Sequence, residues 1–124
     1  MKNGDIMNDN ILMENAIAFA AKAVKLREEL IKEKGENLIS FKLAECAADI
    51  GAEISGAAYS RSRDMHLAAH YEALSLASQC EYWIKLLCTA EYIDNKVHAA
   101  LLEDCMDVKR SIIAAINKAR EGAQ

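Results

Sequence analysis

The chain has no proline and only 5 glycines among its 124 residues, and its aromatic content is 6%. Proline and glycine commonly form the turns between the strands of β-sandwiches and barrels, so their scarcity argues against an all-β fold. No run of 18 apolar residues occurs, because Lys, Glu or Asp interrupts every hydrophobic stretch, and no membrane-spanning helix is expected. The first ten residues lack the apolar core of a secretory signal, so we expect a cytoplasmic protein.

Composition is that of a globular domain, with 52% hydrophobic and 27% charged residues. A chain of this length can bury its own core, so we expect residues 1–124 to form a single domain. Nineteen acidic and 15 basic side chains give a net charge of −4. The chain therefore does not have the overall positive charge that is typical of nucleic-acid binders. The cysteines include no CxxC pair and are interpreted as reduced, buried small hydrophobes. They are Cys46, Cys80, Cys88 and Cys105.

Apolar residues recur at alternating spacings of three and four in four segments, as in amphipathic helices. We predict helices over residues 10–34, 37–59, 63–89 and 94–121. Gly35 lies where a C-terminal cap belongs, and Asp94 is a suitable N-cap for the last helix. Because short connections make neighbouring helices antiparallel, the predicted fold class is all-α, an up-down-up-down four-helix bundle.

The second predicted helix contains many small residues, including Gly51 and Gly56. Each interior glycine costs about 1 kcal/mol relative to alanine, so close packing against a neighbour should compensate. That neighbour could belong to the same chain or to a second subunit. The first and fourth helices each carry two adjacent apolar stripes, which is more apolar surface than one small bundle needs. We therefore expect a cyclic homo-oligomer.

Eight residues are expected in the core or at a subunit interface. Trp83 shares an apolar stripe with Cys80 and Leu87, so it is expected among apolar neighbours rather than as an exposed stacking platform. A structural polar contact explains Glu81 better than a role in acid–base catalysis does. The eight are Phe19, Ile50, Gly51, Ile54, Leu74, Glu81, Trp83 and Leu87.

Catalytic and cofactor motifs are absent, including GxSxG, GxGxxG and the phosphate-binding GxxxxGK[ST]. His66 and His70 are one helical turn apart and could share a metal ion. However, Leu67 stands where the HExxH motif has Glu, and the Glu-x-x-His pairs of di-iron bundles are missing. We interpret both histidines as ordinary polar residues, and we expect no metal, no cofactor and no enzymatic activity.

Basic side chains form two small groups outside the first helix. Arg61 and Arg63 precede the third helix, and Lys109 and Arg110 lie in the fourth. On an isolated chain such groups are expected to be solvated surface. In an oligomer each subunit would contribute the same groups, and together they could form a phosphate-binding surface.

Several motifs together resemble one bacterial protein family. Residues 50–57 (IGAEISGA), Ser62-Arg63, Ala73-Leu74 and residues 81–87 (EYWIKLL) are similar in type and spacing to the family patterns SIGANIAEA, SRKDF and EYWLxLL. This family comprises the small four-helix-bundle proteins encoded by intervening sequences in 23S rRNA genes, and its relatives include the accessory variability protein of diversity-generating retroelements. The resemblance covers about residues 10–121. Departures include Glu53 and Gly56, where the family has Asn and Glu.

The resemblance implies a bundle that assembles into a ring-like homopentamer. The retroelement relatives are basic and bind nucleic acid and a reverse transcriptase, whereas this chain is acidic. The favoured hypothesis is a non-catalytic oligomeric scaffold or adaptor that binds another macromolecule, a protein such as a reverse transcriptase. The alternative is a nucleic-acid-binding accessory factor of a reverse transcriptase or rRNA-associated element, which contacts phosphates through the two basic groups.

Overall fold

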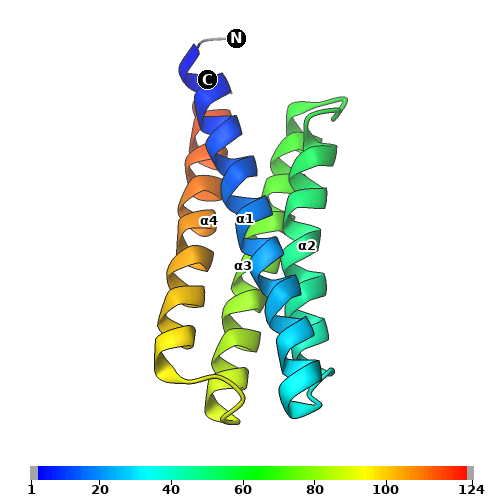
Figure 1. The fold of residues 1–124 in the computed structure, drawn as a ribbon. Helices are drawn as coiled ribbons and strands as arrows, with labels where there is room; N and C mark the ends of the chain where they lie inside the picture. Colours follow the sequence, from blue (N-terminus) through cyan, green and yellow to red (C-terminus); the bar gives the residue numbers. More distant parts are fainter. Residues whose placement is uncertain (1–2, 123–124) are drawn as a thin grey trace.

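The structure is a computed structural model that describes the backbone of residues 3–122 and the side chains of residues 11–122. It contains the helices α1 (Asn3–Lys34), α2 (Ile39–Ala57), α3 (Arg63–Thr89) and α4 (Asn95–Glu121) (Figure 1). The helices run alternately up and down, so both ends of the described chain lie at the same end of the bundle as the α2–α3 connection. Each helix has two others as close neighbours, and within residues 3–122 α1 lies diagonally opposite α3, and α2 diagonally opposite α4. The expected antiparallel four-helix bundle is confirmed.

Helix boundaries follow local capping. The Ser62 hydroxyl accepts a hydrogen bond from the Met65 amide at 3.2 Å, and α3 begins directly afterwards. The Asp94 carboxylate accepts from the Val97 amide at 2.8 Å and starts α4 in the same way. By contrast, α1 begins at Asn3, seven residues before the predicted start. The prediction relied on the apolar stripe, whose first member is Leu12, and the helix extends beyond that stripe.

The core lies along the bundle axis and receives side chains from every helix. Phe19 of α1 is 1% exposed, and Ile50, Leu87 and Ile112 of the other three helices are completely buried. Alanine and cysteine fill the narrower layers between them. Buried apolar side chains supply the dominant favourable free energy of such a fold.

The turn between α1 and α2 is held by Glu36. Gly35 adopts a left-handed backbone with φ of 66°, and its amide donates to the Ile31 carbonyl at 3.1 Å, which ends α1. The Glu36 carboxylate then accepts the amides of Leu38 and Ile39 on one oxygen, at 2.9 and 2.7 Å, and that of Ser40 on the other, at 2.9 Å. It thereby satisfies amide groups that the first turn of α2 leaves without helical partners. The predicted start at residue 37 therefore lies inside this turn.

The same contacts set the acidity of Glu36. Burial by itself raises the pKa of this carboxyl, but the hydrogen bonds from Ser40, Ile39 and Leu38 outweigh it, so the pKa lies below its ordinary value of 4.5. A lowered folded-state pKa means that the carboxylate stabilises the fold above about pH 4.5 and loses this contribution as the pH falls through the folded value.

Glu36→Gln is expected to lower the free energy of unfolding at neutral pH by about 1–2 kcal/mol, because it weakens the capping of α2. The difference from wild type should shrink as the pH falls below about 4.5. Urea denaturation followed by circular dichroism across this pH range measures both effects. Glu45→Gln, an exposed position on α2, is the matched control and should change little. A difference that stays constant with pH would contradict the role given to the Glu36 charge.

Candidate functional site

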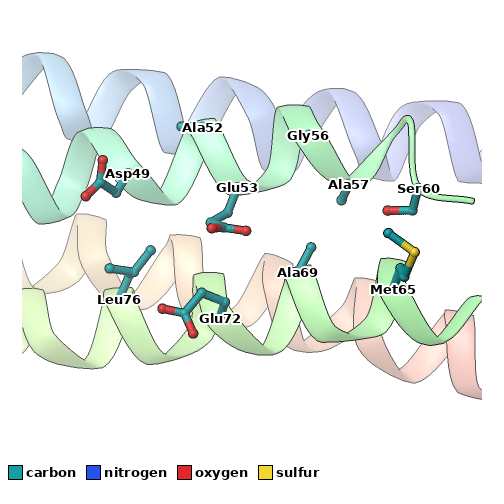
Figure 2. A pocket seen from close by; sticks show the side chains of 10 residues that line it. All are labelled: Asp49, Ala52, Glu53, Gly56, Ala57, Ser60, Met65, Ala69, Glu72 and Leu76. Atoms are coloured by element: carbon teal, nitrogen blue, oxygen red, sulfur yellow. The ribbon is translucent and has the colours of Figure 1, made fainter.

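A groove of about 610 Å³ lies between α2 and α3, towards the end where the two helices connect (Figure 2). Asp49 and Glu53 of α2 and Glu72 of α3 line it, and the Glu53 and Glu72 side chains extend into the space between the helices from opposite sides. No ion pair neutralises these three carboxylates within residues 11–122. Small and apolar side chains form the rest of the surface. They are Ala52, Ala57, Ala69 and Leu76, with Ser60 and Met65 at one end.

The two interior glycines of α2 have different surroundings. A Cβ atom on Gly51 would lie 4.0 Å from the Cβ of Ala16, so α1 packs against this position. A Cβ atom on Gly56 would have no neighbour within 4 Å in the described part of the chain, and Gly56 lines the groove. The bundle itself therefore supplies the packing expected around Gly51 and leaves the surface at Gly56 uncovered.

A strip of large apolar side chains is exposed on α1 and at the start of α2. Ile17, Val24 and Ile31 follow one another at intervals of seven residues, which places them on one face of α1, and they are 61%, 42% and 40% exposed. Leu38 and Phe41 are 64% and 45% exposed. We call these five residues the apolar edge. The second apolar stripe predicted for α1 is thus largely uncovered by its own chain.

Arg27 connects the two helices that form the apolar edge. Its guanidinium carbon lies 5.2 Å from the centre of the Phe41 ring, within the range of a cation–π contact. The Nε atom of Arg27 is buried and has no hydrogen-bond partner among residues 11–122.

The residues predicted for the core or an interface divide into two groups in this chain. Phe19, Ile50, Ile54 and Leu87 are buried. The other four, Gly51, Leu74, Glu81 and Trp83, are half-buried.

Trp83 and Glu81 have partners on other helices. Trp83 packs against the core, with Tyr82 edge-on at 5.0 Å between ring centres and the Lys42 ammonium 5.6 Å from the Trp83 ring centre. The Glu81 carboxylate lies 2.8 Å from the Lys109 ammonium, so this glutamate forms an ion pair between α3 and α4.

The two predicted basic groups are far apart. Arg61 and Arg63 are exposed at the α2–α3 end, and the Arg63 guanidinium lies beside Gly122 at the end of α4. Lys109 and Arg110 lie about 12 residues before that end, roughly 18 Å along the helix. Lys109 pairs with Glu81, and Arg110 pairs with Asp107 at 2.6 Å. The structure therefore does not join the four basic residues into one patch.

Three of the four thiols are buried, and Cys88 is partly exposed. The Cys46 thiol donates to the Leu76 carbonyl at 3.0 Å, and the Cys105 thiol donates to the Ala77 carbonyl at 3.3 Å. Burial, together with the nearby Glu81 carboxylate, raises the pKa of Cys105 to about 12. A hydrogen bond with Cys46 and burial raise the pKa of Cys80. Cys80 and Cys105 are consequently neutral thiols and poor nucleophiles at neutral pH.

Within residues 11–122 no three His, Cys, Asp or Glu side chains converge in a way that could hold a metal ion. His66 and His70 do lie together, with ring centres 4.4 Å apart. No helix in this range combines the length and apolar character that crossing a membrane requires.

The chain is a small antiparallel four-helix bundle, and solved structures contain close matches to it. One is the crystal structure of a protein of unknown function from the S23 ribosomal protein family of Bacteroides thetaiotaomicron, which matches with a TM-score of 0.86 and 28% sequence identity. The match covers 89% of this chain and 98% of that one. The resemblance to this family seen in the sequence motifs is thereby confirmed. No family model matches the chain, and no curated protein does. The link to retroelement accessory proteins stays a prediction.

Proposed function

We propose that the chain is a non-catalytic cytoplasmic scaffold or adaptor that assembles into a cyclic homo-oligomer and binds another protein. The observation that carries this proposal is the apolar edge. Monomeric proteins rarely leave a contiguous row of large apolar side chains in water, and such rows mark interaction sites. Arg27 stacked on Phe41 fits the same interpretation, because arginine and aromatic residues are enriched at interface centres. The family resemblance implies that the oligomer is a homopentamer.

The groove between α2 and α3 is the second surface that the proposal uses. Its unpaired carboxylates favour a cationic partner, and its small side chains provide apolar contact area. Gly56 lets a partner's backbone approach closely, since it presents no side chain. An amphipathic helix with Lys or Arg on its contacting face has the required chemistry. The partner proposed for the groove is a basic helical segment of another protein, and a reverse transcriptase is one candidate source.

Ile17→Glu should dissociate the oligomer, because it places a charge in the apolar edge. Ile17 is exposed in the single bundle, so this substitution should leave the helix content unchanged. Multi-angle light scattering should give five copies of the 13.7 kDa chain for wild type and one for the variant. Tyr71→Glu is the control, because Tyr71 is a large exposed residue of α3, outside the apolar edge and the two helices with doubled apolar stripes, and it should keep the wild-type mass. A monomeric wild type, or equal dissociation by both variants, would refute the assignment.

Nucleic-acid binding is the second candidate function. The observation in its favour is that Arg61 and Arg63 are exposed and have no ion-pair partner within residues 11–122. A ring would bring several copies of this arginine pair to one end of the assembly. Contacts of this kind with phosphates give binding that weakens steeply with salt.

One fluorescence-anisotropy experiment separates the two candidates. The probes are a labelled Lys/Leu amphipathic peptide and a labelled single-stranded RNA, each titrated at two salt concentrations. We expect peptide binding that Glu53→Gln/Glu72→Gln abolishes and Arg61→Ala/Arg63→Ala leaves intact. Tight RNA binding that falls with salt and disappears in the arginine variant would instead establish the nucleic-acid function. Circular dichroism of each variant controls for folding.

A further inference from the structure

A second cavity, of about 290 Å³, lies between α1, α2 and α3 near the α2–α3 connection. Its polar lining consists of His66 and His70 of α3 and Ser55 of α2, and Met13 of α1 contributes a thioether. The remaining lining is apolar, and it includes no carboxylate. His70 is only 4% exposed, so the pocket takes one histidine almost completely out of bulk water.

Hydrogen bonds fix the tautomer of both histidines. The Nδ1 atom of His66 lies 3.1 Å from the carbonyl oxygen of Ala57, and the Nδ1 atom of His70 lies 2.9 Å from the carbonyl oxygen of His66. A carbonyl oxygen can only accept, so each Nδ1 must carry the proton. In a neutral imidazole the lone pair is then on Nε2. Metal-binding histidines are oriented in the same way, because their second nitrogen usually donates to a carbonyl or carboxylate.

The two Nε2 atoms are available as ligands. Among the described residues neither has a hydrogen-bond partner. The rings are one helical turn apart on α3, with centres 4.4 Å apart and planes tilted by 41°. Histidines at positions i and i+4 on one helix face are a known metal-binding pair, with ordinary metal–nitrogen distances of about 2.0–2.1 Å.

We propose that His66 and His70 chelate one late first-row divalent metal ion through their Nε2 atoms. Water, the Ser55 hydroxyl and the Met13 thioether are the groups available for the remaining coordination positions. Neutral imidazoles without a carboxylate disfavour Mg²⁺ and Ca²⁺, which require oxygen ligands. For nitrogen ligands the affinity rises along the first row towards nickel and copper. This inference is independent of the proposed scaffold function and adds a binding site to it.

Isothermal titration of untagged protein with Ni²⁺ tests the site. Wild type should bind one ion per chain, and His66→Gln and His70→Gln should each weaken binding by about tenfold or more. His98→Gln removes the third histidine of the chain, and Cys88→Ser removes the partly exposed thiol. Both controls should bind like wild type. Wild-type affinity no greater than that of His66→Gln, loss of binding in either control, or equal binding of Mg²⁺ would overturn the proposal.

Thermal unfolding gives a second readout that does not depend on the buried histidine. His70→Gln can damage folding because His70 lies inside the bundle, whereas His66 is only half-buried. Excess Ni²⁺ should raise the Tm of wild type and of His98→Gln, because an ion that binds only the folded state stabilises it. It should leave the Tm of His66→Gln unchanged. An equal rise in all three proteins would show that Ni²⁺ acts elsewhere and would refute the assignment.

Discussion

The bundle depends on how closely α2 and α3 approach each other. Ala47 of α2 and Ala73 and Ala77 of α3 are fully buried, and short side chains at buried positions allow a small separation between helix axes. The Cys46 thiol of α2 reaches the backbone carbonyl of Leu76 on α3, which shows directly how near the two backbones are. The other two helices pack against this pair, and the acidic groove runs along its outer side. Larger residues between α2 and α3 would separate the helices and change every other interface.

Ion pairs are distributed unevenly over the interfaces between neighbouring helices. Lys22 and Asp104 connect α1 to α4 at 2.6 Å, and Glu81 and Lys109 connect α3 to α4. Among residues 11–122 no ion pair connects α2 to α3, and three carboxylates lie there without ion-pair partners. Neighbouring like charges repel each other, so this face is electrostatically less favourable than the others in an isolated bundle. A cationic partner would relieve that repulsion.

Local sequence signals were sufficient for the fold. The three-and-four spacing of apolar residues predicted four helices, and Gly35 and Asp94 lie at boundaries that the structure also has. Such signals depend on residues close together in the chain, and a single sequence displays them. The start of α1 was missed because residues 3–10 are mostly polar and show no apolar periodicity. The capping carboxylate of Glu36 was missed because it precedes α2 by several residues and acts through backbone amides.

The sequence alone could not predict which residues of different helices contact each other. The pairing of Glu81 with Lys109 depends on the register of α3 against α4, which no local pattern specifies. For the same reason the sequence could not distinguish Gly51, which faces Ala16, from Gly56, which faces the groove. The histidine pair illustrates the limit most clearly. Its spacing was evident, but the Ala57 carbonyl that fixes the His66 tautomer is brought close only by the turn before α3. The His66 carbonyl that fixes the His70 tautomer lies one helical turn earlier in α3 itself.

Antiparallel neighbours largely cancel the dipoles of the four helices, yet the two ends of the bundle are chemically different. One end has the exposed Arg61 and Arg63, the histidine cavity and both ends of the described chain (Figure 1). The other has the turn capped by Glu36 and the turn before Asp94. Any cyclic assembly with its axis along the helices would therefore have two unlike rims. One rim would carry the arginine pairs, and the other would be closed by the two capped turns. The two faces of such a ring would therefore differ, although its helices alternate in direction.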